Sequence, residues 1–495
     1  MKSAVFLKLA TLIAIILFTS TAYFSKGYFH ADEHYQIVEF AGYKLNTHQK
    51  NELAWEFESK IRPAFQPSIC FLLLKFFQLS NISNPYTQTF FLRLFAGLLA
   101  VFSIYYFIKN TLFLFENENY KKIYILLSYF LWFIPFISVR FSSETFSGLI
   151  FLLAVGVFFH YQLKFKYILI GILFGFCFLF RFQSAILIIG FMAWLYFIKN
   201  DKLNHLAKII FAFIVIFLFG LIVDFWFYES FVITSWNYFK INLIDGAAAK
   251  FGTSPWYFYI KSILLDTTIP IGLLIILSFI VLIIKHSRQF LLWIFLPFII
   301  IHSIIGHKEE RFLFPLIYFI PLIICLAYQT LIKAFHQKEN LKIVNYIIII
   351  LIIPINLMAL VVFSSHPAGA GQMKLTENIY STYEDKKVNI IYPSFGNPYN
   401  PWNGLPTKFY TTQNLNFIKI DELCDLKDML FDSSAINILI IRQFDLNRLN
   451  NCVENIEKYR FSFKQKSISD FQLFLNNYYK RLDNQNVLLM YERLE

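Results

Sequence analysis

Apolar runs of about twenty residues recur along this 495-residue chain and constrain its fold more than any other feature. A helix of about 20 apolar residues crosses the bilayer core, which is about 30 Å thick. Only 15% of the residues are charged, against about 25% in an ordinary soluble domain. We therefore predict an α-helical polytopic membrane protein with about eleven transmembrane helices. The candidate spans are 5–24, 87–108, 122–140, 144–163, 167–180, 184–198, 207–226, 263–284, 288–306, 312–332 and 343–363.

Two of these assignments have alternatives. Lys2 and Lys8 precede the first apolar run as in a signal peptide, but no small-x-small cleavage site follows cleanly, so an uncleaved first helix is predicted. The runs 167–180 and 184–198 are short. They fit two spans, one broken pair, or a re-entrant segment that turns at Arg181.

The positions of the basic residues predict the topology. The net charge of +12 might suggest nucleic acid, but the lysines and arginines lie in short loops between apolar runs, and no nucleic-acid partner is expected. Alternate loops carry them, which marks one side as cytoplasmic by the positive-inside rule. The other side holds the long loop 25–86 and most carboxylates near the spans. Chemistry is therefore expected on the non-cytoplasmic side.

The chain changes character after the last span. We predict a transmembrane catalytic domain over residues 1–363 and a small extracytoplasmic α/β domain over 364–495, joined by a glycine-rich linker. Strands are expected at 387–392 and 435–441, with a helical segment at 420–430. Cys424 and Cys452 form a disulfide if this region is outside, or remain reduced thiols. The sequence has no CxxC pair, so no zinc or redox site is expected, and neither a metal nor another cofactor is predicted.

The first outer loop begins with an acidic pair, Asp32 and Glu33, beside His30. Carboxylates this close to lipid are costly, and an aspartate there can act as a general base that deprotonates a sugar hydroxyl. The alternative is a solvated pair that caps a helix. Further along the loop, Trp55 and Arg62 fit an aromatic wall and a phosphate contact, because a guanidinium donates paired hydrogen bonds to phosphate. An interfacial helix with a Trp anchor fits them equally well.

Charged side chains also stand at membrane depth. Arg140 and Glu144 flank one turn, and Arg181 and Gln183 another. They either shape a substrate site or form ion pairs, with Glu144 or Asp224 as the carboxylate partner.

The turn from His307 to Arg311 carries five ionisable residues in succession on the carboxylate-rich side. Its cations, His307, Lys308 and Arg311, need either carboxylates or a bound phosphate, and the phosphate is favoured. Trp256 lies in an aromatic loop that suits a sugar or a lipid interface.

Seven segments occur in this order along the chain: HADEHYQ (30–36), EFAGYKL (39–45), ELAWEF (52–57), IRPAFQP (61–67), DFWFY (224–228), SPWYFY (254–259) and HKEERFLFP (307–315). Together they resemble glycosyltransferase family 22, the α-mannosyltransferases of GPI-anchor and N-glycan assembly and their bacterial relatives. The resemblance covers about residues 5–335. One departure is Ala31, which stands where the family usually has proline, and this changes the stiffness of the loop more than its chemistry.

The resemblance implies a GT-C fold and an inverting, metal-independent transfer of mannose from a polyprenyl or dolichyl phosphate to a glycan or glycolipid acceptor. Asp32 would be the base, with Glu33 orienting acceptor or base. His307, Lys308, Arg311 and Arg62 would meet the donor phosphate, whose developing charge fixed cations stabilise. His30, Trp55, Arg140, Glu144, Arg181, Gln183 and Trp256 would shape the substrate site.

Two alternatives stay open: a transporter or flippase of lipid-linked sugars, and a GT-C enzyme that uses another lipid-phosphate sugar. The composition favours a bacterial inner membrane, whereas eukaryotic relatives lie in the endoplasmic reticulum membrane.

Overall fold

The structure is a computed structural model that describes residues 2–334, 348–369, 371–393, 396–401, 405–448, 452–479 and 486–494. Its contacts divide the chain into two compact units, each described by itself. The first unit comprises residues 1–23, 56–69 and 92–365, and the second comprises 24–55, 70–91 and 366–495. Two pieces of the predicted outer loop therefore belong to the same unit as the C-terminal region. The predicted span 343–363 begins outside the described residues.

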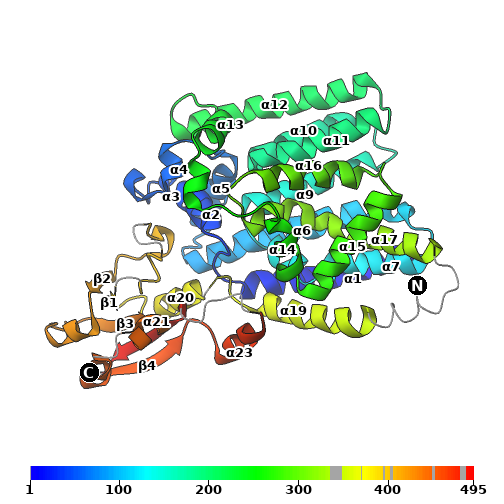
Figure 1. Ribbon diagram of the computed structural model, residues 1–495. Helices are drawn as coiled ribbons and strands as arrows, with labels where there is room; N and C mark the ends of the chain where they lie inside the picture. Colours follow the sequence, from blue (N-terminus) through cyan, green and yellow to red (C-terminus); the bar gives the residue numbers. More distant parts are fainter. Residues whose placement is uncertain are drawn as a thin grey trace. The chain divides into compact units, whose positions relative to one another are not determined.

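The first unit is helical, and in it α10 packs against both α9 and α12 (Figure 1). Gly171 and Gly175 permit this approach, because a Cβ on either would overlap Ile209, Ala212 or Ile216 of α12. Small residues are common where membrane helices meet closely. Its longer helices are α1 (Ser3–Phe24), α5 (Phe65–Leu79), α6 (Pro85–Thr111), α7 (Glu118–Phe130), α9 (Ser143–Phe158), α10 (Lys166–Phe180), α11 (Ala185–Phe197), α12 (Leu203–Tyr228), α14 (Phe258–Asp266), α15 (Ile269–Lys285), α16 (Phe290–Ile304), α17 (Ile320–Ala334) and α19 (Ile353–Ser365), of which α5 and α6 each continue into the second unit.

Shorter elements connect these helices. They are α4 (Trp55–Glu58), η3 (Leu112–Leu114), α8 (Phe133–Ser138), η4 (Phe182–Ser184), α13 (Thr234–Phe239), η5 (Lys240–Ile244), η6 (Ala247–Phe251), η7 (Glu310–Phe319) and η8 (Ile348–Ile352).

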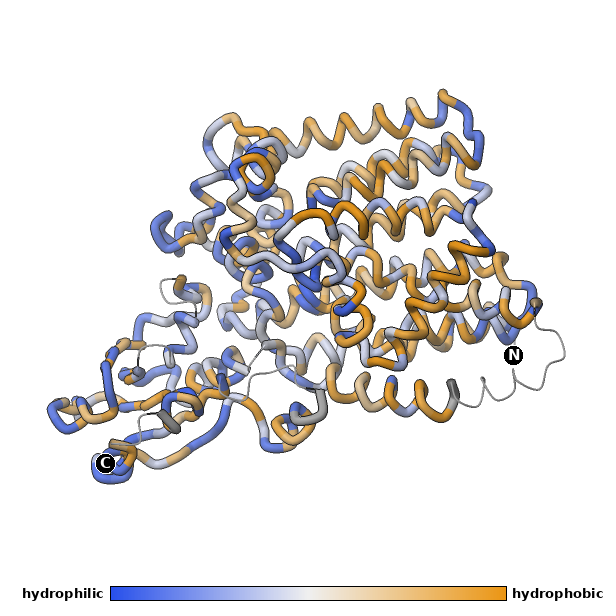
Figure 2. The backbone as a smooth tube through the Cα atoms, viewed as in Figure 1, coloured by the Kyte–Doolittle hydropathy of each residue, from blue (hydrophilic) through white to orange (hydrophobic). Residues whose placement is uncertain are grey.

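Four helices in the described part of the chain are long and apolar enough to cross a membrane: Ser3–Phe24, Pro85–Leu114, Leu203–Tyr228 and Glu310–Ala334. A fifth arises if α15 and α16, bent by 120° at their junction, count as one span. Figure 2 shows these helices as mainly hydrophobic tubes. Every predicted run overlaps a helix, but several of those helices are short, and the count of eleven is not confirmed.

Two local predictions change. The apolar helix α5 lies inside the predicted loop 25–86, where no span had been expected. The ambiguous segment at 167–198 forms two helices, α10 and α11, with extended backbone at Arg181 between them. The Ser184 hydroxyl stabilises this break by donating to the Arg181 carbonyl at 2.7 Å.

The second unit combines loop helices with a five-stranded sheet in the order β2-β1-β3-β5-β4. The strand β1 pairs in parallel with β2 and β3, whereas β5 pairs antiparallel with β3 and β4. Its elements are α2 (Ala31–Glu33), η1 (His34–Val38), α3 (Glu39–Lys44), η2 (Lys50–Glu52), α20 (Gln372–Thr382), β1 (Val388–Pro393), η9 (Lys408–Tyr410), β2 (Leu415–Ile420), η10 (Leu423–Lys427), β3 (Ile436–Arg442), α21 (Gln443–Arg448), α22 (Glu454–Lys458), β4 (Phe461–Lys466), α23 (Asp470–Tyr479) and β5 (Leu488–Arg493).

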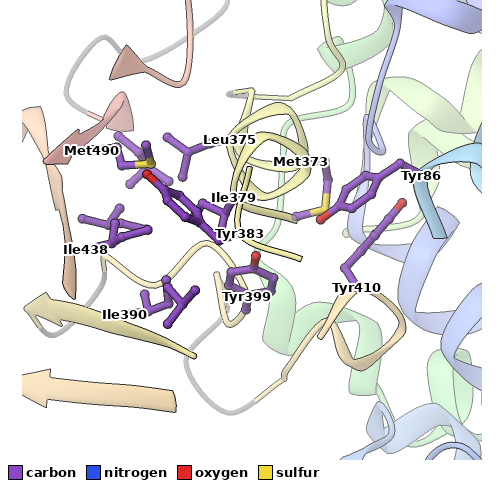
Figure 3. Close-up of a cluster of buried hydrophobic side chains, with 13 residues drawn as sticks. Tyr86, Met373, Leu375, Ile379, Tyr383, Ile390, Tyr399, Tyr410, Ile438 and Met490 are labelled. Carbon is purple, nitrogen blue, oxygen red and sulfur yellow. The ribbon is translucent and has the colours of Figure 1, made fainter. Parts of the chain in front are cut away.

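The predictions of β1 and β3 are confirmed, and the small α/β region is present. The helix expected at 420–430 is wrong: β2 runs to Ile420, and only the short 3-10 turn η10 follows. One face of the sheet packs against α20 and Tyr86, Tyr399 and Tyr410 (Figure 3). Cys424 in η10 forms a disulfide with Cys452, which confirms one of the two alternatives.

Candidate functional site

The acidic pair lies in the first turn of a helical stretch that runs from Ala31 to Lys44. His30 caps this stretch, and its Nδ1 accepts a hydrogen bond from the Asp32 N–H at 3.3 Å. Glu33 is buried, and its Oε1 accepts from the Phe29 N–H at 3.3 Å. The Asp32 side chain is 19% exposed, with Oδ1 3.7 Å from His30 Nδ1. The two carboxylates thus differ: Glu33 supports the helix start, and Asp32 reaches solvent.

A π-helical turn, His34–Val38, follows the acidic pair and brings His34 and Glu39 together. The His34 Nε2 lies 2.5 Å from Glu39 Oε1, and His48 forms an ion pair with the other Glu39 oxygen. Burial raises the pKa of the Glu39 carboxyl, but both histidines outweigh this effect and lower the pKa to about 2. This cluster was not predicted from the sequence, because five-residue spacing puts two side chains on one face of a π-turn but not of an α-helix.

Aromatic rings connect the loop to the C-terminal part of the same unit. His34 is stacked between Tyr28 and Tyr410, with ring centroids 5.1 and 5.3 Å away. Tyr410 stacks in turn on Tyr86 at 4.9 Å. The Phe409 N–H also lies 3.3 Å from both Glu39 oxygens. The position of the acidic loop therefore depends on residues near 410.

In the first unit, Glu144, Arg181 and Arg311 meet. Glu144 Oε1 accepts from Arg181 Nη1 at 2.7 Å and from Arg311 Nη1 at 3.0 Å. All three side chains are at least nine-tenths buried. Both guanidinium groups also approach the Phe312 ring, at 5.1 and 5.6 Å. One carboxylate thus fixes two arginines that are 130 residues apart in sequence.

The charged turn supplies further contacts. Glu309 pairs with Arg311 Nε, and its Oε1 lies 2.8 Å from His307 Nε2. Lys308 Nζ donates to the carbonyls of Ser254 at 2.7 Å and Ile305 at 2.6 Å. Lysine near a helix C-terminus commonly binds its last carbonyls in this way. The alternative that carboxylates hold this turn is therefore borne out for His307 and Arg311, and their contact with a phosphate stays a prediction.

Two other predicted residues meet at Tyr238. The Arg62 guanidinium lies 5.8 Å from the Tyr238 ring, and Gln183 donates to the Tyr238 hydroxyl. Arg62 Nη2 is also 3.8 Å from Glu56 Oε1.

The other predicted residues, Arg140, Trp55 and Trp256, differ in burial. Arg140 is fully buried, with its guanidinium 5.4 Å from the Phe136 ring. Trp55 and Trp256 are exposed, at 40% and 69%. In the described part of the chain no cluster of His, Cys, Asp and Glu suits a metal ion.

Asp224 forms no ion pair with an arginine among the described residues, contrary to one of the alternatives above. Its carboxylate accepts from the Ala64 N–H at 2.8 Å and from the Thr234 hydroxyl at 2.6 Å. Asp224 therefore holds the start of α5, just after Arg62.

Comparison with known proteins finds curated mannosyltransferases among the relatives of this chain. GPI mannosyltransferase 3 of Candida albicans is 25% identical over 58% of this chain and 57% of its own length. The α-1,2-mannosyltransferase ALG9 of Saccharomyces cerevisiae is 31% identical over 32% of this chain and 29% of its own. The chain thus spans little more than half the length of the first of these relatives and less than a third of the second.

The apo crystal structure of ArnT from Cupriavidus metallidurans covers 97% of both chains with a TM-score of 0.51 at 8% identity, which shows a shared overall fold. The predicted GT-C resemblance is thereby supported at the level of fold. The model of the Alg9-like mannosyltransferase family matches residues 9–411, and the chain therefore belongs to that family.

Proposed function

We propose that the chain is a membrane mannosyltransferase that moves mannose from a polyprenyl or dolichyl phosphate to a glycan or glycolipid acceptor. The transfer inverts the anomeric configuration, takes place at the non-cytoplasmic face and needs no metal ion. The buried pair Arg181 and Arg311 on the single carboxylate of Glu144 carries this proposal.

Arg181 suits a phosphate because only part of its guanidinium is used within the protein. Its hydrogen bonds to described residues run from Nη1, to Ser143 and Glu144. A guanidinium has five N–H donors, so Nε and Nη2 stay available for phosphate oxygens. Glu144 holds the Arg181 guanidinium in place before the substrate arrives. A group fixed in advance stabilises a developing charge well, because it does not have to reorient during the reaction. ArnT, which shares the fold, has been crystallised with undecaprenyl phosphate, which supports a lipid-phosphate donor.

Asp32 is the stronger candidate for the base. Glu33 accepts the Phe29 N–H and is buried, whereas Asp32 is partly exposed with His30 beside its carboxylate. A base must reach the hydroxyl that it deprotonates. We therefore propose that Asp32 takes the proton of the acceptor hydroxyl and that Glu33 supports the loop.

Two observations support the non-cytoplasmic face. The loop containing Asp32 contacts the C-terminal region, so both lie on one side of the membrane. That region carries the Cys424–Cys452 disulfide, and disulfides persist in oxidising compartments. The topology predicted from the basic residues also puts this loop on the non-cytoplasmic side.

The test uses the full chain in nanodiscs with synthetic polyprenyl-phosphate mannose and a panel of mannosylated acceptors. We expect Asp32→Asn to lower kcat by about 10²–10⁴-fold, the usual contribution of general-base catalysis. Asp245→Asn, an exposed loop carboxylate, is the matched control. Full activity of Asp32→Asn would reject the assigned base.

The donor site has its own test. Arg181→Lys keeps the charge but loses the planar set of donors, and we expect kcat/KM for the donor to fall by about 10²–10³-fold. The control is Arg288→Lys, an exposed arginine. An unchanged donor kcat/KM would remove Arg181 from the donor site. Movement of the lipid between leaflets without product would favour a flippase, and turnover of another lipid-phosphate sugar alone would correct the donor.

A further inference from the structure

A pocket of about 710 Å³ lies within the second unit. Its wall includes α20, the segment Phe463–Asp470 at the end of β4, and the single residues Lys26 and Asn84. Ligand pockets in proteins commonly measure about 300–1,000 Å³. The pocket is therefore large enough for several sugar rings.

Two residues of the pocket wall are close in sequence to the ends of candidate membrane spans. Lys26 follows the end of α1 at Phe24 by two residues, and Asn84 directly precedes α6. Both helices are candidate membrane spans. Two extended residues reach about 7 Å, so these two wall residues lie level with the lipid headgroups. A ligand that touches both is the headgroup of a lipid or a molecule bound at that level.

The uncharged wall residues suit a saccharide. Asn378, Gln465 and Ser381 line the pocket, and the Asn378 amide donates to Gln465 Oε1 at 2.5 Å. Tyr380 and the half-exposed Phe463 add aromatic surface. Amides both donate and accept hydrogen bonds, as sugar hydroxyls do, and aromatic rings cover the apolar faces of sugars.

The charged wall residues add one net positive charge. Lys26 pairs with Glu377 at 2.5 Å, and Lys466 pairs with Asp470 at 2.6 Å. Lys374 is exposed and also lines the pocket, and no carboxylate of the described residues lies within ion-pair distance of it. An anionic group on the ligand would complement this lysine.

We propose that this pocket binds a phosphate-bearing saccharide, the headgroup of the lipid-linked acceptor. The inference rests on the proposed mannosyl transfer. Lys26 belongs to the same loop as Asp32, six residues before it, so a ligand held here is bound by the segment that carries the base. The phosphate meets Lys374, and the sugar rings meet the amides and the aromatic surface.

The test measures binding of phosphorylated mannotriose to the full chain in nanodiscs, with no donor present. We expect Lys374→Glu to raise its Kd at least tenfold. Ser381→Trp, which fills the rim, should raise the Kd similarly. Lys386→Glu, the same charge change on an exposed lysine outside the pocket, should leave it unchanged. Equal Kd values for Lys374→Glu and Lys386→Glu would overturn the proposal.

Further arms separate the possible ligands. Mannotriose without phosphate should bind at least tenfold more weakly, and vesicles of phosphatidylglycerol should not compete. Competition by those vesicles would make the pocket a phospholipid site and overturn the acceptor proposal. Asp32→Asn should retain binding, which separates this inference from the proposed function. In the active enzyme, Lys374→Glu should raise KM for a phosphorylated acceptor and leave kcat unchanged.

Discussion

Replacing Gly42 with alanine tests the buried cluster of Glu39 and its two histidines. Gly42 lies in α3 and has an ordinary helical backbone, so alanine alone would favour the helix by about 0.5–1 kcal/mol. However, a Cβ there would overlap the His48 ring, whose Nε2 would be only 2.9 Å away. The ring has little freedom to move, because it is buried and contacts both Glu39 and Thr47.

The expected change in the free energy of unfolding follows from the displacement of the His48 ring. Displacing His48 removes one of the two histidines from the buried Glu39 carboxylate, and breaking a buried pair costs about 3–5 kcal/mol. The helical gain offsets part of this cost, so we expect Gly42→Ala to destabilise the second unit by about 2–4 kcal/mol. For a unit of roughly 150–250 residues this lowers Tm by about 2–4 °C per kcal/mol.

A double-mutant cycle separates the clash from other effects. His48→Ala removes the ring, and in that background Gly42→Ala should be neutral or stabilising, because only the helical preference remains. Thermal unfolding of the detergent-solubilised protein, followed by intrinsic fluorescence, gives the four Tm values. If Gly42→Ala lowers Tm equally in the unsubstituted protein and in the His48→Ala variant, the steric argument is refuted.

Three further outcomes follow from the structure. The pKa of Glu39 is lowered from 4.5 to about 2, so its contribution to stability is present above pH 4.5 and is lost as the pH falls towards 2; acid unfolding of the Glu39→Gln variant should lack this loss. Asp224→Ala leaves two buried donors without their acceptor and should cost about 2–4 kcal/mol by thermal unfolding. Asp224→Asn keeps an acceptor oxygen and should cost less, and equal losses for the two variants would contradict this reading. Cys452→Ser should cost about 3–4 kcal/mol for a disulfide between residues 28 apart, and reductant should then have no further effect on urea unfolding.

Helices at the apolar runs and the strands β1 and β3 were predictable because their signals are local. An apolar run of span length, or an alternating strand such as β3, is visible in a short window of sequence. The helix α5 was missed since it lies between polar segments that suggested one continuous loop. The prediction of a helix near 425 was wrong because its polar residues, which suit a helix, instead follow β2 and form a single 3-10 turn.

The candidate site was predictable in part. The pairing of Arg181 with Glu144 was one of two alternatives, because charges at membrane depth require a partner. The cluster of His34, Glu39 and His48 was not predictable, since it needs a π-turn and a close approach at Gly42. The participation of Tyr410 in the loop was also hidden, because no short-range pattern links positions 370 or more residues apart.

The stacking of His34 between Tyr28 and Tyr410 has a consequence for biosynthesis. The contact between Glu39 and Phe409 spans 370 residues, so at about 5–20 residues per second the loop is synthesised roughly 20–75 s before its partner rings. During that interval the loop lacks half of its aromatic support. A nascent chain stalled before residue 409 would therefore expose the loop to proteases and chaperones, and translation past that point completes its protection.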